Sequence, residues 1–204
     1  DIAEVMLVGH ASSNDDFCYA MPGAKVRKLH SSKRDAFKVV NSVPFAKIFP
    51  DRIEIISDYN SRRKRKIKAD TKFEERVALI KFYPGQNPDI LDYYLKKRYK
   101  GIVIEMVGLG HVATAGTNAW NKKLREVQKK GMVVCAAAQT IYGRLDPLVY
   151  SSGRELLKTG IIYLEDMLAE TALVKLGWVL GHKNWDVKGK MLENVSREFS
   201  NRLN

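Results

Sequence analysis

The stretch from Val26 to Phe37 contains the side chain whose type and position best suit proton transfer. Side chains alternate between the two faces of a strand, so Lys28 lies on the same face as Val26. If Val26 is buried, the Lys28 ammonium points inward, where loss of water favours the uncharged amine. Lysines in such places can act as general bases. The alternative that the pattern leaves open is a solvated basic loop.

His111 and Tyr150 are the next candidates for a role in a site. His111 closes the flexible turn Gly108-Leu109-Gly110-His111, which follows an apolar run, and Tyr150 directly precedes a predicted helix. An imidazole can donate or accept a proton near neutral pH, and a phenol can orient a ligand. The competing interpretations are a surface histidine and a tyrosine that only packs against its neighbours.

The elements that position these residues alternate regularly from Val77 onward. Apolar runs predict buried strands, and apolar residues at helical spacing predict the helices between them. Strand, helix, strand, helix, strand indicates a parallel sheet with right-handed crossovers. The predicted strands are Val77–Phe82, Ile102–Met106 and Met132–Ala138, with helices around Ile90–Leu95 and Trp120–Val127.

Ligands of open parallel sheets bind outside the carboxyl ends of the strands. The loops at these ends are Phe82–Gln86, Val107–Ala113 and Gln139–Arg144. Asn87 is a good N-cap and Pro88 suits the first position of the first helix. Further helices are expected over Ser152–Lys158, Glu170–Leu180 and Val187–Leu203.

The beginning of the chain has a different character. Glu4–Val8 and Lys25–Val26 are strand-like and are separated by a polar loop at residues 12–16. A polar segment follows with the basic run Arg62–Lys66, and a short hairpin is expected around Arg52–Ile56. We therefore expect residues 1–50 to be the last part of one domain, residues 51–75 to be a basic connector and residues 76–204 to be a second domain.

Composition excludes some classes of protein. The 204 residues are 45% hydrophobic and 28% charged, as in ordinary globular proteins, and no apolar run approaches the roughly 20 residues of a membrane span. Cys18 and Cys135 have no partner at metal-ligand or redox spacing and suit a reducing cytoplasm. The net charge of +12 favours partners that carry phosphate or carboxylate.

Several segments together resemble the asparaginase/glutaminase family. Lys28 stands two residues after a valine and precedes a hydroxyl pair and a phenylalanine, as in the lysine-bearing loop of that family. The order and spacing of the other matching segments agree over nearly the whole chain. They are Lys81–Gly85, Gly101–Glu105 with Gly108–His111, Gln139–Arg144, Val149–Gly153, and Glu165–Met167 with Glu170–Ala172.

The resemblance implies a parallel-sheet α/β fold of the asparaginase type. The chain would hold the C-terminal part of the family's N-terminal domain and a complete, smaller C-terminal α/β domain. In this family a threonine attacks a side-chain amide, and a Thr-Asp pair with a lysine activates it. Lys28 matches that lysine, while no Thr-Asp dipeptide occurs in this chain. We therefore expect the nucleophile upstream of Asp1 and read the start as a cut.

His111 matches the position from which the family supplies a substrate-side group across the dimer interface, and Tyr150 is a weaker candidate for the same role. Within the family, Gly108–His111, Gln139–Arg144 and Trp178–His182 are most similar to the branch formed by the D-type subunits of archaeal-type Glu-tRNA(Gln) amidotransferases. The resemblance implies a cytoplasmic, homodimeric glutaminase subunit that passes ammonia to a partner subunit.

That partner would use ATP and Mg²⁺ and hold most of the Glu-tRNA(Gln). No phosphate loop and no metal-ligand motif stands in this sequence, so no cofactor is expected in the chain itself. Two alternatives remain open. One is a free L-asparaginase with the same chemistry, and the other is a non-catalytic, RNA-associated relative that has lost its nucleophile.

Overall fold

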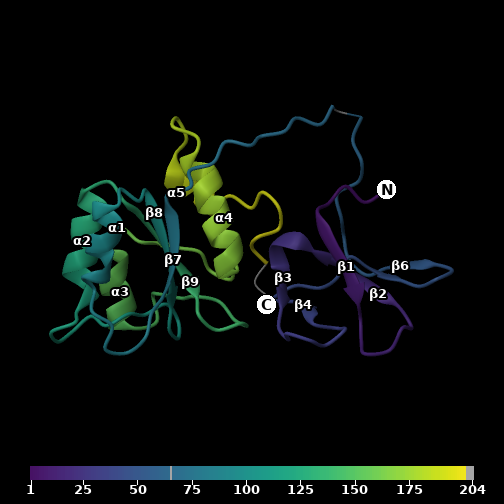
Figure 1. The fold of residues 1–204 in the computed structure, drawn as a ribbon, viewed down its shortest axis with the longest axis horizontal. Helices are drawn as coiled ribbons and strands as arrows, with labels where there is room; N and C mark the ends of the chain where they lie inside the picture. The colour runs from purple at the N-terminus through teal and green to yellow at the C-terminus, as the bar shows by residue number, and fades with distance from the viewer. Residues whose placement is uncertain (65, 201–204) are drawn as a thin grey trace. The chain divides into compact units, whose positions relative to one another are not determined.

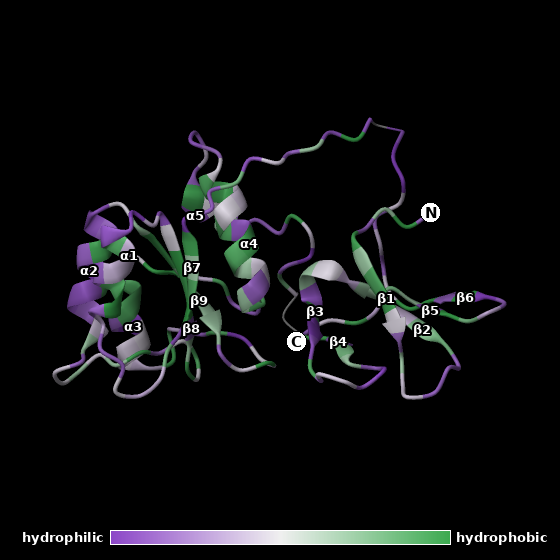
Figure 2. Ribbon diagram, in the orientation of Figure 1, coloured by the Kyte–Doolittle hydropathy of each residue, from purple (hydrophilic) through white to green (hydrophobic). Residues whose placement is uncertain are grey.

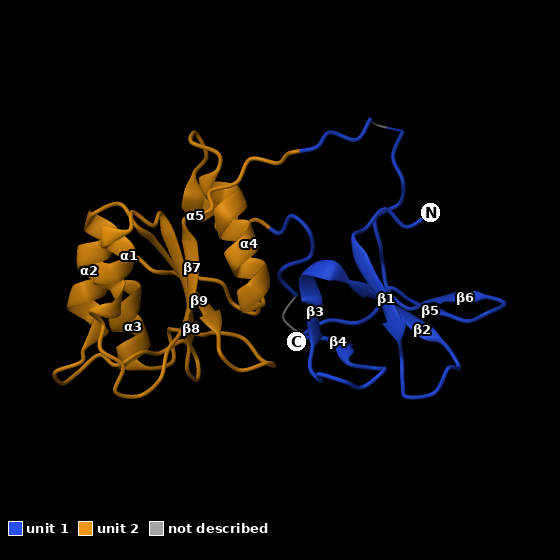
Figure 3. Ribbon diagram, viewed as in Figure 1, with its two compact units in different colours: residues 1–69, 194–204 blue, residues 70–193 orange. Residues whose placement is uncertain are grey.

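The computed structural model describes residues 1–64 and 66–200, and it contains two compact units (Figures 1 and 3). The first unit comprises Asp1–Ala69 with the segment that begins at Asn194, and the second comprises Asp70–Glu193. The sequence-based domain limits at residues 50 and 75 stay predictions, and the segment after Asn194, which we assigned to the second domain, belongs to the first unit.

The second unit is built on a parallel sheet in the order β10-β9-β8-β7. Its strands are β7 (Val77–Lys81), β8 (Gly101–Met106), β9 (Val133–Ala138) and the short β10 (Ile162–Tyr163). The register pairs Val77 with Gly101 and Gly101 with Val133, so the three long strands start together. The prediction of a parallel α/β fold is confirmed, and β10 is an additional strand too short for pattern analysis to find.

Helices cover both faces of this sheet. Figure 1 shows α1 (Ile90–Lys96), α2 (Trp120–Lys129) and α3 (Ser151–Leu157) on one face and α4 (Ala169–Leu180) on the other. Because both faces are covered, β8 is buried along its whole length, and Figure 2 colours the strands mainly toward the hydrophobic end of its scale. This explains the continuous apolar runs of the sequence, which parallel strands require.

Alternate residues of β8 serve the two faces. Ile102, Ile104 and Met106 are fully buried and share one core with Trp120 and other residues of the crossover helices. On the opposite face Gly101 lets α4 approach closely, since a Cβ there would lie 2.8 Å from methyl carbons of Leu176 and Leu180.

The predicted capping of the first helix is only partly right, because the N-cap of α1 is Asp89, without a side-chain cap hydrogen bond, and Asn87 and Pro88 lie in the turn before it. The Asn87 side chain accepts a hydrogen bond from the Asp89 N–H at 2.9 Å, and tight turn bonds from Asn87 and Pro88 lead into the helix. Lys123 of α2 then binds Asp89 at 3.0 Å and Asp92 at 2.7 Å. These two hydrogen bonds raise the pKa of Lys123, so it remains charged and ties α2 to α1.

The first unit is mainly antiparallel. Its larger sheet has the order β1-β2-β5-β6, formed by β1 (Met6–His10), β2 (Cys18–Pro22), β5 (Ala46–Ile48) and β6 (Ile53–Ile55). A two-stranded sheet pairs β3 (Val26–Lys28) with β4 (Phe37–Val39). The hairpin expected around Arg52–Ile56 is present as the pairing of β6 with β5.

The helix that we expected over Val187–Leu203 is shorter than predicted. α5 spans Val187–Leu192, and Glu193 is already extended. Beyond this point, side chains bind backbone groups that would otherwise pair within a helix. The Glu198 carboxylate accepts a hydrogen bond from the Ser196 N–H, and the Asn194 side-chain amide donates one to the Phe199 carbonyl. Residues 201–204 of that prediction lie outside the described residues.

The segment Asp70–Glu74 crosses the end of α4 at very short range. The Glu74 N–H donates to the Gly177 carbonyl at 2.9 Å. A Cβ at Gly181 would lie 2.6 Å from the Phe73 backbone nitrogen and 2.7 Å from the Lys72 carbonyl carbon. The glycine is therefore required by the approach of backbone to helix, since the clashing atoms are main chain and cannot rotate away.

We predict that Gly181→Ala lowers the free energy of unfolding by about 1–3 kcal/mol, the usual cost of overpacking. Urea unfolding followed by tryptophan fluorescence measures the change. Val174→Ala on the same helix is the control, because Val174 is 61% exposed and its truncation should cost less than about 0.5 kcal/mol. Equal stability of Gly181→Ala and the unmodified chain would show that the segment does not depend on this contact.

Candidate functional site

His111 lies in a tight loop at the carboxyl edge of the parallel sheet. Val107 and His111 exchange backbone hydrogen bonds of 3.1 and 2.9 Å, which close the loop on itself. Gly108 and Gly110 make the reversal with φ angles of 53° and 103°, a region that favours glycine. The Gly-x-Gly-His segment of the sequence thus forms a closed loop whose backbone fixes the position of the His111 side chain.

Tyr163 of β10 supports this loop. Its hydroxyl donates to the Gly110 carbonyl at 3.0 Å, and its ring would clash with any Cβ at Gly110, at 2.6 Å. Burial raises the pKa of Tyr163, so the hydroxyl keeps its proton and remains a donor. Tyr163 leaves no signal in the sequence, because a strand of two residues is too short to form a pattern.

The structure brings His111 and Tyr150 together. Their rings meet edge to face with centroids 5.5 Å apart, and the His111 Nδ1 lies 3.2 Å from the Ser152 hydroxyl. Tyr150 is 57% exposed and stands just before α3. Ser152, which the sequence analysis did not single out, is the polar contact that orients the imidazole.

The second nitrogen of His111 is buried. Nε2 is shielded from water and has no hydrogen-bond partner within the described part of the chain. A Ser–His pair that attacks substrate needs an acid on the far ring nitrogen, and no such group stands there among residues 1–64 and 66–200. The arrangement therefore suits binding and orientation of a polar group rather than nucleophilic attack by Ser152.

Two motifs noted in the sequence are joined beside this loop. Arg144 forms ion pairs with Glu165 and, at 3.7 Å, with Asp166, while the Leu145 N–H donates to the Glu165 carbonyl at 3.0 Å. Glu165 has a positive φ of 48°, an unusual value for a residue with a side chain. Arg144 thus fixes the loop after β9 to the turn after β10, at the same edge of the sheet as His111.

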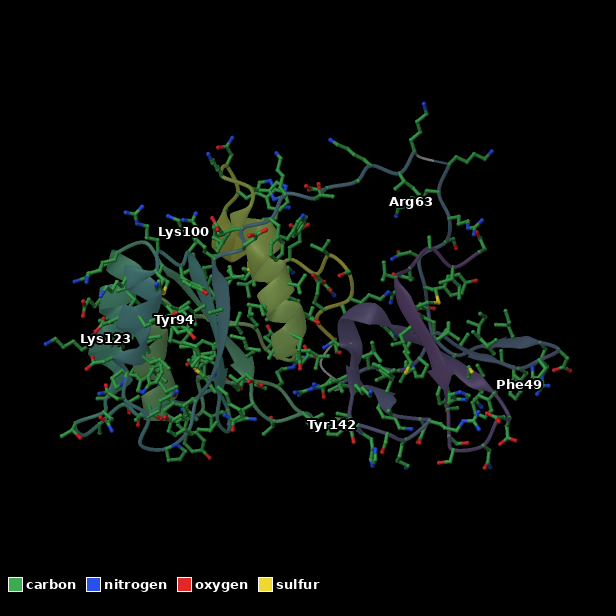
Figure 4. The ribbon with its side chains drawn as sticks, in the orientation of Figure 1. Phe49, Arg63, Tyr94, Lys100, Lys123 and Tyr142 are labelled. Atoms are coloured by element: carbon green, nitrogen blue, oxygen red, sulfur yellow. The ribbon has the colours of Figure 1, made fainter. Side chains whose placement is uncertain are left out.

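Gln139 connects two further strand ends. Its side-chain amide donates to the Phe82 carbonyl at 2.6 Å and contacts the Glu105 carbonyl at 3.4 Å. The loops at Phe82–Gln86, Val107–Ala113 and Gln139–Arg144 were the expected ligand loops, and all follow the carboxyl ends of their strands. Tyr142, labelled in Figure 4, lies in the last of them.

Lys28 is exposed in the first unit, so it does not have the inward direction that a buried Val26 would have given it. Val26, on the same face, is only partly buried, because β3 has three residues and pairs with β4 alone. The Lys28 Nζ lies 5.9 Å from the centre of the Phe37 ring. The fully buried lysine is Lys25, which stands just before the strand. The catalytic role of Lys28 stays a prediction.

The loop after Lys28 is nevertheless ordered. The Leu29 N–H donates to the Ala36 carbonyl at 2.8 Å, and the His30 Nδ1 accepts backbone N–H groups of Ser32 and Lys33, each at 3.1 Å. Asp35 binds Lys38 at 2.7 Å, and this hydrogen bond holds the pKa of Asp35 below its ordinary value. Lys28 therefore stands at the start of a closed, hydrogen-bonded turn.

A separate pocket of about 440 Å³ lies at the end of α4. The His182 ring stacks on Trp185 with centroids 3.7 Å apart and contacts Asp70 at 3.0 Å through Nε2. Partial loss of water raises the pKa of Asp70, but the His182 contact and backbone hydrogen bonding outweigh it and lower that pKa overall. The lining residues are Lys72, Gly181, His182, Lys183, Asn184 and Trp185, so none of the predicted site residues belongs to it.

Within the described residues, no group of three or more His, Cys, Asp or Glu side chains is arranged to hold a metal ion. No helix in that part of the chain has the length and apolar character needed to cross a membrane.

We predict that Tyr163→Phe lowers the free energy of unfolding by about 1–3 kcal/mol, because the Gly110 carbonyl loses its donor in a buried place. Urea denaturation provides the measurement. Tyr142→Phe, at a site 59% exposed, is the matched control and should change stability by less than about 0.5 kcal/mol. If the two variants are equally stable, Tyr163 does not support the His111 loop.

Comparison with known proteins agrees with this geometry. Residues 76–189 match the glutaminase/asparaginase C-terminal domain. The chain is 46% identical to the D-type subunit of the glutamyl-tRNA(Gln) amidotransferase from Thermococcus kodakarensis, across 98% of this chain and 46% of that protein. The corresponding protein of Pyrococcus abyssi is 47% identical with the same coverage. The chain thus spans about half the length of the curated relatives it matches.

Among solved structures, the thermostable L-asparaginase from Thermococcus kodakarensis superposes with a TM-score of 0.79 at 27% identity, over 90% of this chain and 56% of that one. The domain match covers more than half of the 204 residues and includes all three of the loops at the carboxyl edge. The chain therefore belongs to the glutaminase/asparaginase family of amidohydrolases, and residues 76–189 are its C-terminal domain.

Proposed function

We propose that the protein is the glutaminase subunit of a Glu-tRNA(Gln) amidotransferase, which releases ammonia from glutamine for use by a partner subunit. The observation that carries the proposal is the 46–47% identity to relatives named as the D-type subunits of such enzymes, across 98% of the chain. The ammonia would convert Glu-tRNA(Gln) to Gln-tRNA(Gln) in the cytoplasm, on the partner subunit and with its ATP and Mg²⁺.

In this proposal Lys28 moves the proton during attack on the glutamine amide. This chain contains no Thr-Asp dipeptide, and the proposal assigns the nucleophilic threonine and the Thr-Asp pair to another part of the full-length protein. A lysine can carry out this step because its amine accepts a proton once the charged form is disfavoured by its surroundings. Lys28 is exposed in the first unit, so the proposal requires further groups to surround it.

His111 would bind the substrate of the neighbouring subunit in a homodimer. Three features support this role: the glycine loop that presents the ring, the Ser152 contact that orients it, and the unpartnered Nε2. Tyr150 stands beside it, on an exposed part of the surface, and would close the same site.

The basic run Arg62–Lys66 would contact tRNA phosphate in this complex. Its described members Arg62, Arg63, Lys64 and Lys66 are exposed, and Arg65 lies outside the described residues. Such contacts strengthen binding without reading sequence. The alternative is a solvated connector that makes no contact with tRNA.

A free L-asparaginase is the second candidate, favoured by the structural likeness to the L-asparaginase of Thermococcus kodakarensis. The two candidates differ in substrate. Ammonia release from glutamine and from asparagine by the full-length protein separates them, and faster turnover of asparagine would contradict the amidotransferase assignment.

We predict that Lys28→Met in the full-length protein lowers kcat for glutamine hydrolysis by about 10²–10⁴-fold, the usual contribution of a general acid or base. The side chains have similar length, and only the titratable amine is lost. Coupled detection of ammonia measures the rate, and thermal unfolding verifies the fold. Lys33→Met in the same loop is the control, and wild-type turnover by Lys28→Met would remove Lys28 from the mechanism.

We also predict that the 204-residue chain alone releases no ammonia above the uncatalysed rate, because it carries the candidate lysine without the threonine it would serve. The same ammonia assay at high protein concentration provides the measurement. Turnover that disappears in Lys28→Met would show that the nucleophile lies within this chain.

A further inference from the structure

Cations gather at the amino edge of the parallel sheet, the edge opposite His111. In a parallel sheet all strands begin at one edge, so every crossover helix ends there too. The connection from α1 to β8 and that from α2 to β9 both carry exposed basic residues at this edge. They are Lys96, Lys97, Arg98 and Lys100 in the first connection and Lys129 and Lys130 in the second.

Backbone hydrogen bonds hold these connections side by side. The Lys100 N–H donates to the Arg76 carbonyl at 2.8 Å, and the Val133 N–H donates to the Lys100 carbonyl at 2.9 Å. The starts of β7, β8 and β9 are therefore adjacent, with Arg76 and Lys100 standing next to them. Figure 4 shows Lys100 at the end of the sheet far from Tyr142.

Acidic residues neutralise only part of this charge. Glu74 pairs with Arg76 at 2.9 Å and Glu126 pairs with Lys130 at 2.7 Å. Lys100 contributes a further, weaker attraction to Glu74. The remaining cations of the edge form no ion pair within the described part of the chain, namely Lys96, Lys97, Arg98 and Lys129.

A cation in the last turn of a helix is favoured by the helix dipole, typically by 0.3–1 kcal/mol, and this accounts for Lys96 and Lys129 without a ligand. It does not account for Arg98. Arg98 has a φ of 60°, in the left-handed region where a side chain costs about 1–2 kcal/mol. A strained residue of this kind calls for a functional explanation.

The other crossover helix shows what this position ordinarily holds. α1 and α2 end in the same motif, with the Tyr99 N–H bound to the Tyr94 carbonyl at 3.0 Å and the Met132 N–H bound to the Val127 carbonyl at 3.1 Å. The left-handed residue is Gly131 after α2, with a φ of 87°. Glycine is the usual residue there because it has no Cβ. Arg98 therefore carries a guanidinium at a position where glycine would give the backbone a lower conformational energy.

Aromatic rings flank this guanidinium in the chain, on α1 and directly after it. Tyr94 contacts Tyr99 and Tyr93 edge to face, with centroids 5.0 and 5.4 Å apart, and Tyr93 is 57% exposed. Exposed aromatic rings among cations are typical of surfaces that bind nucleic acids, where cations hold phosphates and rings stack on unpaired bases. Tyr94 and Tyr99 are partly buried against the core, so Tyr93 is the exposed ring of the three.

We propose that the amino edge of the parallel sheet, at Lys97, Arg98, Lys100 and Lys129, is an RNA-binding surface that holds the phosphate backbone of tRNA. The choice of tRNA rests on the proposed function above. A guanidinium donates two parallel hydrogen bonds to one phosphate, which explains an arginine at the strained position. The His111 loop at the opposite edge stays free for the amide substrate.

The test uses the 204-residue chain and a fluorescent tRNA transcript, with anisotropy titrations between about 50 and 200 mM KCl. Each phosphate contact contributes roughly 0.7–0.9 to the slope of log affinity against log salt. Lys97→Ser with Lys129→Ser should therefore lower the slope by roughly 1.5. Lys81→Ser with Lys122→Ser removes the same charge away from the amino edge and should leave the slope unchanged.

Arg98→Gly gives the sharper test, because relief of the positive φ should raise the midpoint of thermal unfolding while the slope falls by roughly 0.8. Arg98→Lys keeps both charge and strain, and should keep most of the slope. A wild-type slope for Arg98→Gly, or equal losses in the two double variants, would overturn the proposal.

Sedimentation with phosphatidylserine vesicles separates RNA from an anionic membrane surface. Loss of vesicle binding in Arg98→Gly without loss of tRNA binding would also overturn the proposal. Glutamine hydrolysis by the full-length protein tests the proposed function separately. If glutamine is not hydrolysed but the salt slopes change as predicted, the RNA-binding surface is supported and the proposed function is not. If glutamine is hydrolysed but the slopes are unchanged, the proposed function is supported and the RNA-binding surface is not.

Discussion

Burial of β8 on both faces is the constraint on which the second unit depends. Every residue of the strand is buried, so its backbone groups must pair with β7 and β9, and its side chains must serve two cores. Gly101 begins the strand because α4 needs the space that a Cβ would occupy. This pairing makes the three long strands start together. The sheet therefore has one edge where the strands begin and an opposite edge where the loops that follow the strands lie.

The carboxyl edge is organised by contacts between loops rather than by the sheet alone. Tyr163 supports the Gly108–His111 turn, Arg144 joins the loop after β9 to the turn after β10, and Gln139 bridges strand ends. These contacts fix the direction of His111 before any ligand arrives. Preorganisation of this kind is what the substrate-orienting role proposed for His111 would require.

The two edges carry different kinds of strain. At the carboxyl edge the positive φ angles of Gly108 and Gly110 cost little, because glycine has no Cβ. Glu165 also has a positive φ there, and its carboxylate forms an ion pair with Arg144. At the amino edge Arg98 accepts strain without an ion pair among the described residues. In both places the positive φ closes a turn, and Arg98 differs in the exposed cation that it carries there.

The sequence by itself determined the parallel α/β class, the three long strands and the loops that follow them, because buried parallel strands must be continuous apolar runs bounded by turn residues. It also indicated the family, through short motifs whose order is kept along the chain. It did not reveal β10, the early end of α5 or the contacts of Ser152 and Tyr163, since these depend on neighbours distant in sequence. Only the tertiary structure decided that Lys25 is buried and Lys28 exposed, because alternation fixes which residues share a face but not which face is covered.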